Sequence, residues 1–268
     1  MILAELGKAE EAVIELRTAV ANGLDDEAAH EAAAKLGWLL AELRRYEEAT
    51  EVIENLQRTA PNDGKLALQR GAYLIEMERY EEAVAALTDG LRLQPDNSTM
   101  LCLRGGALAE CKKHAEAMAD IERSLAVGID DPKVRAVAYH VRGNLHAALS
   151  DYYRAWTDLT KSIELNPRSA DAYASKAAVY LAKGEFDRAI ADCDAAIRLQ
   201  PDCVDAFAKR GRAYFEKGLY DEAAKDDARV EALRTAKAAG AAAKGTSAGH
   251  VPDGMEIGAG AVGDVGPT

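Results

Sequence analysis

The stretch "AYASKAAVYLAKGEFDRAIADCDAAIRLQP" (Ala172 to Pro201) contains the complete pattern of two short amphipathic helices. Apolar residues recur at helical spacing, first at Tyr173, Ala177 and Tyr180 and again from Phe186 onward. Proline ends the stretch, and because proline has no amide hydrogen and restricts the residue before it, the second helix is expected to stop there. The stretch therefore predicts a helical hairpin.

The same pattern recurs along most of the chain. An alanine near the start of each second helix returns at spacings of 37, 34, 34, 38, 34 and 34 residues, at Ala12, Ala49, Ala83, Ala117, Ala155, Ala189 and Ala223. The two long spacings coincide with "GLDDE" (residues 23–27) and "GIDDP" (residues 128–132), which lengthen a connection. A block of three units is thus written twice, which explains why "LRLQPD" at residues 91–96 returns as "IRLQPD" at residues 197–202.

A small residue in the middle of each first helix is expected to let the two helices of a hairpin cross closely. These residues are Gly37, Gly71, Gly105, Gly143, Ala177 and Gly211. The residue before each of the last five is basic (Arg70, Arg104, Arg142, Lys176 and Arg210), and its long aliphatic stem can lie along an apolar surface.

These recurring positions resemble the tetratricopeptide repeat family, whose unit is 34 residues of helix, turn and helix. The resemblance covers about residues 1–237 and implies an all-α fold, a right-handed α-α superhelix of helical hairpins. It implies six full repeats, at residues 30–63, 64–97, 98–135 with its longer connection, 136–169, 170–203, and 204–237 with an extended capping helix. Residues 1–29 would supply the end of a first helix and a whole second helix. The Ala- and Gly-rich residues 238–268 are predicted to be disordered.

Composition excludes several classes of partner. The formal net charge of -12 disfavours nucleic acid and anionic membranes as partners. No apolar run approaches the roughly 20 residues that span a bilayer, and the N-terminus lacks the layout of a signal peptide. Four irregularly spaced cysteines fit a reducing compartment. We therefore predict a cytoplasmic protein.

The sequence contains no recognisable catalytic motif. It contains no phosphate-binding glycine loop, no nucleophile elbow and no pair of histidines at metal-ligand spacing. His146 falls on an inward position and is interpreted as a core residue, while Cys111 and His114 fall short of the usual four ligands of a structural zinc site. We predict that the chain is not an enzyme and needs no cofactor or metal.

In the family, the first helices line a concave groove that receives a peptide or a partner helix. The resemblance assigns to this partner-binding groove Lys35, Trp38, Lys65, Leu68, Gln69, Leu103, His140, Val141, Asn144, Ser175, Lys209 and Arg212. The same register adds Ile75, Cys102, Glu110 and Phe215 to the groove surface. Trp38 is either a binding anchor or a ring that packs on the irregular first hairpin.

We predict a protein-interaction scaffold, with two alternatives. The first is a co-chaperone that binds the C-terminal carboxylate of a cytosolic chaperone. Asn144 and Lys209 fit the clamp of that subgroup, but His140 and Ser175 depart from it, and Asp205 would repel the carboxylate. The second is the targeting arm of a multidomain enzyme whose catalytic part lies outside this chain. Self-association through the uncapped N-terminal helix also stays open.

Overall fold

The computed structural model describes residues 2–21 and 27–247, and in these ranges the chain forms thirteen α-helices and no strands. The helices are α1 (Ile2–Ala21), α2 (Glu27–Glu42), α3 (Tyr46–Thr59), α4 (Gly64–Glu76), α5 (Tyr80–Leu93), α6 (Ser98–Glu110), α7 (His114–Val127), α8 (Pro132–Ala148), α9 (Tyr152–Leu165), α10 (Ala170–Ala182), α11 (Phe186–Leu199), α12 (Val204–Glu216) and α13 (Tyr220–Ser247). The predicted all-α superhelix of hairpins is confirmed. No described helix combines the length and apolar character that a bilayer span needs.

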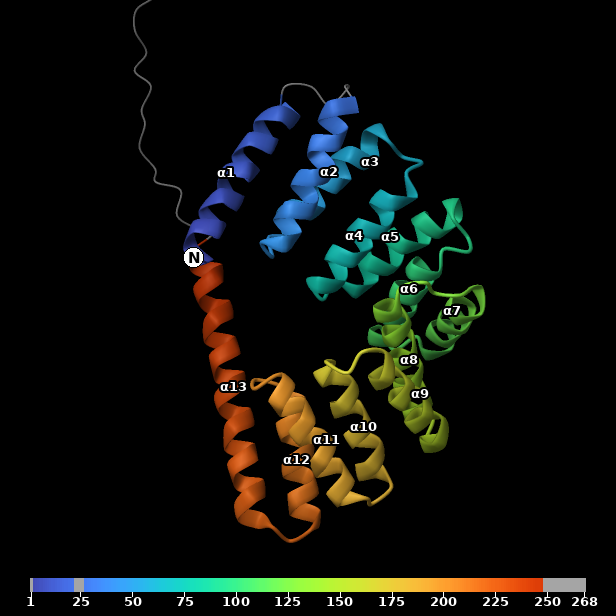
Figure 1. Ribbon diagram of the computed structural model, residues 1–268, viewed down its shortest axis with the longest axis vertical. Coiled ribbons are helices and arrows are strands. Elements are labelled where there is room, and N and C mark those ends of the chain that lie inside the picture. The colour runs from blue at the N-terminus through green and yellow to red at the C-terminus, as the bar shows by residue number, and fades with distance from the viewer. Residues whose placement is uncertain (1, 22–26, 248–268) are drawn as a thin grey trace, which may run out of the picture.

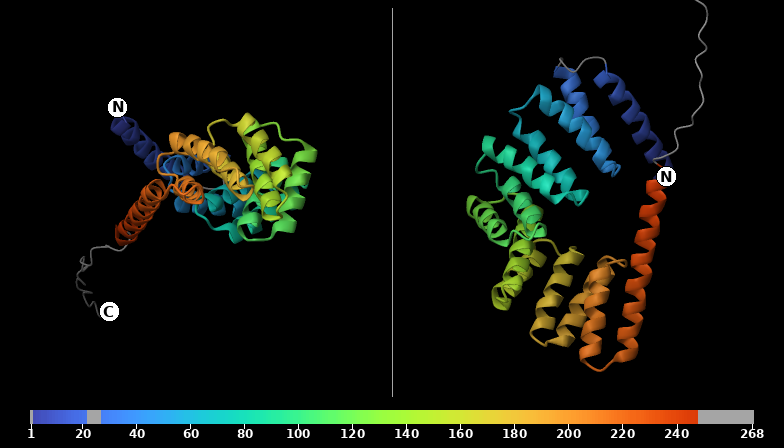
Figure 2. Two further views of the ribbon diagram at one scale, coloured as in Figure 1. Left: turned by 90° about the horizontal axis from the view of Figure 1, so that it is seen from below. Right: turned by 180° about the vertical axis from the view of Figure 1, so that it is seen from behind.

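The hairpins stack side by side and curve round an open centre (Figure 1). Successive first helices contact one another, α4 with α6, α6 with α8, α8 with α10 and α10 with α12. Figure 2 shows that the chain also winds out of this plane, because α1 and α13 approach in the face-on views but diverge when seen from below. The even-numbered first helices therefore form the inner, concave layer.

Each hairpin turns through one residue in the left-handed region of the backbone. In the described ranges these residues are Arg44, Glu78, Lys112, Ser150, Gly184 and Gly218. The next amide donates to a carbonyl five residues back, as from Arg79 N to Leu74 O at 2.9 Å. This is the helix ending that satisfies the last carbonyl groups of a first helix.

The two helices of a hairpin cross at the small residue predicted from the sequence. A Cβ added to Gly71 would lie 2.5 Å from Leu87 Cγ, and one added to Gly105 would lie 2.8 Å from Ile121. The hairpin of α10 and α11 has Ala177 at the crossing and the smaller Cys193 opposite, both fully buried. The summed volume of the two facing side chains is therefore similar in each hairpin, as close packing requires.

In three hairpins the arginine beside the crossing forms a largely buried ion pair with an aspartate sixteen residues later. Arg104 pairs with Asp120, Arg142 with Asp158 and Arg210 with Asp226, each through two hydrogen bonds of 2.7–2.8 Å. The sequence analysis explained these cations only by their aliphatic stems. The structure shows that they also satisfy a buried carboxylate on the second helix of the same hairpin.

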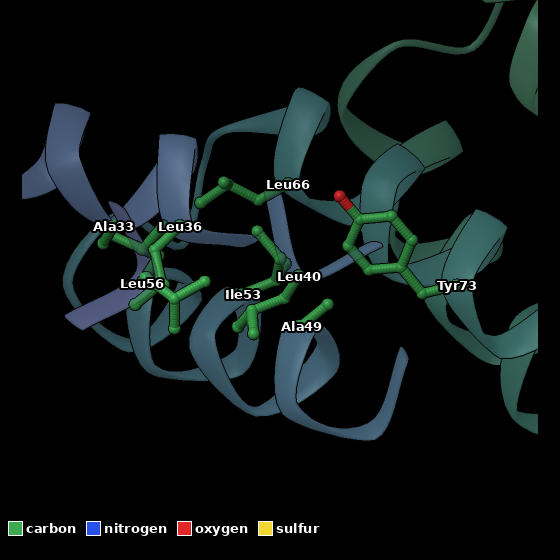
Figure 3. Close-up of a cluster of buried hydrophobic side chains, with 9 residues drawn as sticks. Ala33, Leu36, Leu40, Ala49, Ile53, Leu56, Leu66 and Tyr73 are labelled. Atoms are coloured by element: carbon green, nitrogen blue, oxygen red, sulfur yellow. The ribbon is translucent and has the colours of Figure 1, made fainter. Parts of the chain in front are cut away.

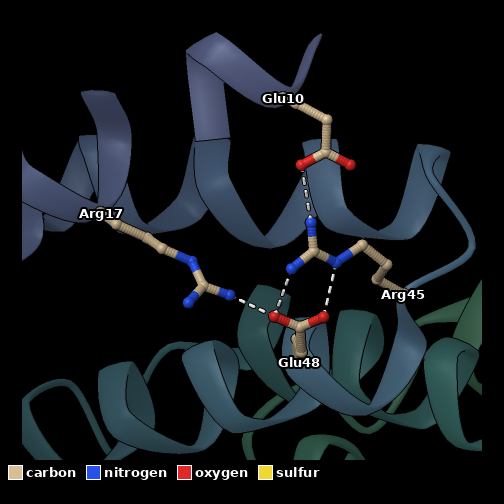
Figure 4. Close-up of polar contacts among 4 residues, drawn as sticks. All are labelled: Glu10, Arg17, Arg45 and Glu48. Atoms are coloured by element: carbon tan, nitrogen blue, oxygen red, sulfur yellow. Dashed lines mark hydrogen bonds and ion pairs between the residues drawn. The ribbon is translucent and has the colours of Figure 1, made fainter. Parts of the chain in front are cut away.

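The N-terminal end has the largest buried apolar cluster among those found in the described ranges, formed by Val13, Ala33, Leu36, Leu40, Ala49, Ile53, Leu56, Leu66 and Tyr73 (Figure 3). Polar contacts also tie α1 to the next hairpin (Figure 4). Arg45 donates to Glu10 at 2.9 Å and to Glu48 at 2.6 Å, and Arg17 pairs with Glu48. The hydrogen bond from Arg45 is the main cause that lowers the pKa of Glu48. Helix α1 is thus docked on the superhelix by packing and charge together.

Helix α1 differs from the prediction because it is continuous from Ile2 to Ala21. The predicted break between the end of a first helix and a whole second helix is wrong. A turn here would interrupt backbone hydrogen bonds, and there is no complete first helix in residues 1–8 whose packing would compensate for the loss.

In the repeat at residues 98–135, the end of the longer connection forms the first turn of α8. Asp131 caps α8 by accepting a hydrogen bond from Lys133 N at 2.7 Å, and Pro132 lies in the first turn of α8. Ile129 is buried with Cys102 and Ile121. The longer connection therefore places the apolar side chain of Ile129 between the hairpin α6–α7 and the hairpin α8–α9. It also adds one turn to the start of α8.

Helix α13 is longer than predicted. It runs to Ser247, whereas the sequence analysis ended it at Lys237 and assigned residues 238–268 to a disordered tail. Alanine predominates after Lys237 and has the highest helix propensity, which explains the extension. Residues 248–268 lie outside the described ranges.

We expect Gly71→Ala to lower the free energy of unfolding by about 1–3 kcal/mol, because the new methyl group must displace Leu87 from the helix crossing. The matched control is Gly106→Ala on α6, where a Cβ would meet only Val141 Cγ2 at 3.8 Å. That change should raise stability by up to about 1 kcal/mol through helix propensity. Urea denaturation of both variants measures the difference, and equal effects would contradict the crossing argument.

We expect Lys176→Arg to stabilise the fold by about 1 kcal/mol. Lys176 Nζ lies 3.4 Å from one oxygen of Asp192, while the other oxygen is buried and has no partner in the described ranges. Burial raises the pKa of Asp192, and Lys176 only partly opposes this. Arginine would donate to both oxygens, as Arg210 does to Asp226.

The reverse change, Arg142→Lys, is the control and should destabilise by a similar amount, because it removes one of the two hydrogen bonds to Asp158. Thermal unfolding followed by circular dichroism reports both variants. A lower melting temperature for Lys176→Arg would contradict the proposed geometry.

Candidate partner-binding groove

All twelve predicted groove residues lie on the inner helices α2, α4, α6, α8, α10 and α12. Five are exposed, namely Lys35, Trp38, Lys65, Asn144 and Arg212. The other seven are half-buried, namely Leu68, Gln69, Leu103, His140, Val141, Ser175 and Lys209. Cys102, which the register also placed on the groove surface, is fully buried and donates to Val134 O at 3.7 Å. It therefore lies behind the groove surface without exposing its side chain, because Ile129 packs with it.

A pocket of about 370 Å³ opens between α4, α6 and α8. The structure brings four of the twelve predicted residues together on its walls, namely Leu103, His140, Val141 and Asn144. Three residues that the register added, Ile75, Cys102 and Glu110, line it as well. The sequence analysis missed Tyr80, Gly106, Val137, Leu145, Lys112 and His114, which also line it. An apolar hollow with a few polar groups at its edge is the usual form of a binding site.

Gly106 opens the floor of this pocket. It stands at the position that Trp38 and Asn144 occupy in other inner helices, and a Cβ placed on it would meet only Val141. Here the missing side chain leaves space rather than permitting a helix crossing. The only sequence signal was the pair Gly105 and Gly106, of which Gly105 alone was assigned a role.

His140 forms the polar wall of the pocket and joins two neighbouring groove residues. Its Nε2 lies 2.9 Å from Ser175 Oγ and 3.1 Å from Asn144 Nδ2. Because the amide nitrogen of Asn144 donates and cannot accept, this contact makes Nε2 the acceptor and places the proton of the neutral ring on Nδ1. Burial lowers the pKa of His140, so the imidazole is neutral at pH 7.

The two ends of the groove are more polar than the pocket. At the C-terminal end Lys209 pairs with Asp205 one turn earlier on α12. At the N-terminal end Lys35 pairs with Glu31 at 2.7 Å. Both cations are thus already matched by an acid of the same helix.

Trp38 exposes 58% of its surface and is not among the described residues that pack on the N-terminal cluster. Its counterpart Asn144 faces the preceding inner helix, α6, across the pocket. Helix α2 has no such neighbour among the described helices, because α1 occupies the place of a second helix. The exposed indole is explained by that missing neighbour.

The described ranges hold no group of three or more His, Cys, Asp or Glu side chains placed to bind a metal ion. Cys102 and Cys193 are buried thiols whose pKa is raised to about 12, by desolvation. They are protonated at neutral pH and serve as small apolar side chains.

Comparison with known proteins identifies the repeat. Two family models match the chain, and both are described as tetratricopeptide repeat. One matches residues 1–64 and 68–132, and the other matches residues 170–203, so together they cover more than half of the chain. No curated protein matches the chain.

Several solved structures share the fold. A tetratricopeptide repeat protein from Parabacteroides merdae is 18% identical with a TM-score of 0.69, covering 86% of this chain and 88% of that one. PilW, a type IV pilus biogenesis factor, is 18% identical with a TM-score of 0.66, covering 77% and 94%. A structure of MamA is 27% identical with a TM-score of 0.50, covering 63% and 96%. At 18% identity the first two show the fold alone.

We expect the free energy of unfolding to fall when the pH drops below about 6.5, partly through His140. Burial lowers its pKa in the folded state, so the unfolded state binds more protons in this window and is favoured by acid. Asp171 and Glu110 oppose the shift in the pKa of His140, and Lys209 adds to it.

His140→Gln should reduce the loss of stability between pH 7 and pH 5. Identical pH profiles for the wild type and His140→Gln would contradict this assignment.

Proposed function

This chain belongs to the tetratricopeptide repeat family, and on that premise we propose that it is a non-catalytic scaffold that binds a peptide or helix of a partner protein in its concave groove. The observation that carries the proposal is the pocket between α4, α6 and α8. Ile75, Leu103, Val137 and Val141 place apolar surface on the inner layer, where a compact fold would otherwise bury it.

The energetics of this pocket suit one or two apolar side chains of a partner. Burying a side chain of the size of leucine, methionine or phenylalanine contributes about 1.5–3 kcal/mol. Asn144 and His140 at the edge supply hydrogen bonds that fix orientation rather than affinity. We propose this pocket as the anchor of the groove and Trp38 as a second contact at its N-terminal end.

The co-chaperone alternative has less support. A carboxylate clamp needs free cations, but Lys209 is paired with Asp205 and His140 is neutral and half-buried. Breaking the Lys209 pair to bind a ligand carboxylate would leave Asp205 as a like charge beside that ligand. No contact in the described ranges favours the targeting-arm alternative over a free-standing scaffold.

A photo-crosslinking residue tests the groove directly. Placed at Asn144, it should crosslink partner proteins in native lysate, whereas the same residue at Thr157 on the outer helix α9 should not. Gly106→Met fills the pocket and should reduce the crosslinks from position 144 by about tenfold. Gly106→Ala adds only one methyl group and is the matched control. Trp38→Ala with His140→Glu and Asn144→Ala, compared in affinity capture, extends the test to the whole groove.

Crosslinks that are equal at positions 144 and 157, or unaffected by Gly106→Met, would assign binding to another face. Circular dichroism of the Gly106→Met variant checks that its helices are intact.

A further inference from the structure

The pocket lies beside the path of the last helix of the chain. Helix α13 starts at Tyr220 and runs back toward the N-terminal repeats across the open side of the ring (Figure 1). Lys237 Nζ on α13 lies 3.8 Å from Glu78 Oε1 in the turn between α4 and α5. Ile75 and Tyr80, on either side of that turn, are pocket walls. Both ion-pair partners are exposed, so the contact adds little stability, but it brings the Lys237 side chain to the turn whose flanking residues line the pocket.

We infer that the pocket is occupied in the free protein by the chain's own segment Val251–Ile257, which a partner must displace. The inference rests on the proposed function, since it concerns regulation of the same site. It assigns the groove an autoinhibitory ligand carried by the chain itself.

The length of chain after α13 allows this segment to reach the pocket. Ser247 is ten residues beyond Lys237, which is about 15 Å further along the helix. Met255 is eight residues beyond Ser247, and an extended chain of that length spans about 26 Å. The segment can therefore return to the level of Glu78 and still have about 10 Å left to enter the pocket. Residues 248–250 are too close to Ser247 to make this return.

The chemistry of the segment matches the pocket. Met255 and Ile257 are two residues apart, so in an extended chain both side chains point the same way. Methionine adapts to irregular apolar hollows. Glu256 stands between them, and Lys112, which has no ion pair in the described ranges, lies on the rim with His114 and Glu110.

Tethering makes such weak contacts sufficient. A short connection to α13 gives the segment an effective concentration in the millimolar range at the pocket. Two buried apolar side chains then hold it in place, yet a partner with a better anchor can still displace it.

Intramolecular crosslinking of the purified full chain tests the inference. With the photo-crosslinking residue at Asn144, we expect crosslinks to residues 251–257, located by mass spectrometry. Met255→Asp with Ile257→Asp should reduce them about tenfold, because two buried apolar contacts are lost. Val262→Asp with Val265→Asp makes the same chemical change later in the chain and should leave them unchanged. Circular dichroism of both double variants checks that the helices of the superhelix are intact.

Three results would overturn the inference. One is the absence of crosslinks to residues 251–257, and another is an equal reduction by both pairs of substitutions. The third is crosslinks that join heavy-isotope and light chains in a mixture, which would assign the segment to a second copy.

The lysate experiment on position 144 separates this inference from the proposed function. If partner crosslinks appear there while the purified chain shows none to residues 251–257, the groove function stands and only the autoinhibition fails. If Met255→Asp with Ile257→Asp instead increases partner crosslinking from position 144, both are supported.

Discussion

The structure depends on the close crossing of two helices at one small residue in every hairpin. Where Gly71 or Gly105 stands at the crossing, a leucine or isoleucine from the second helix fills the space against its backbone. Where Ala177 stands there, the opposing residue shrinks to Cys193. Each hairpin buries only part of its apolar surface, so it is stable only when neighbouring hairpins cover the rest. The crossing sets how thick each hairpin is, and hence how the hairpins stack.

Charge reinforces the same contact. The cation next to the crossing bonds to an aspartate of the second helix, as Arg104 does with Asp120, in surroundings where an unpaired carboxylate would be costly. Arg210 extends the pattern, because it also donates to Asp194 of the preceding hairpin at 2.6 Å. Neighbouring hairpins are therefore joined by directional contacts as well as by apolar packing. Residues that look like departures from an apolar repeat pattern hold the hairpins in register.

The pocket in the groove exists because one position of the inner helices lacks a side chain. Stacked inner helices would present a continuous wall, but Gly106 removes a side chain from it and the connection at residues 128–131 wedges α8 against Cys102. An apolar pocket results, with His140 and Asn144 on its polar side. The proposed binding site thus lies where the repeat is irregular, while the regular positions hold the helix crossings.

The sequence by itself determined the all-α class, the hairpins, the small residues at the crossings and the helices that form the inner layer. It did so because the 34-residue period repeats local patterns whose physics is short-ranged. It could not decide that α1 would continue unbroken, that Cys102 would be buried, or that Gly106 would open a pocket while its neighbour Gly105 packs. Those outcomes depend on what lies across from each residue. Contacts between helices distant in sequence exist only once the superhelix has formed.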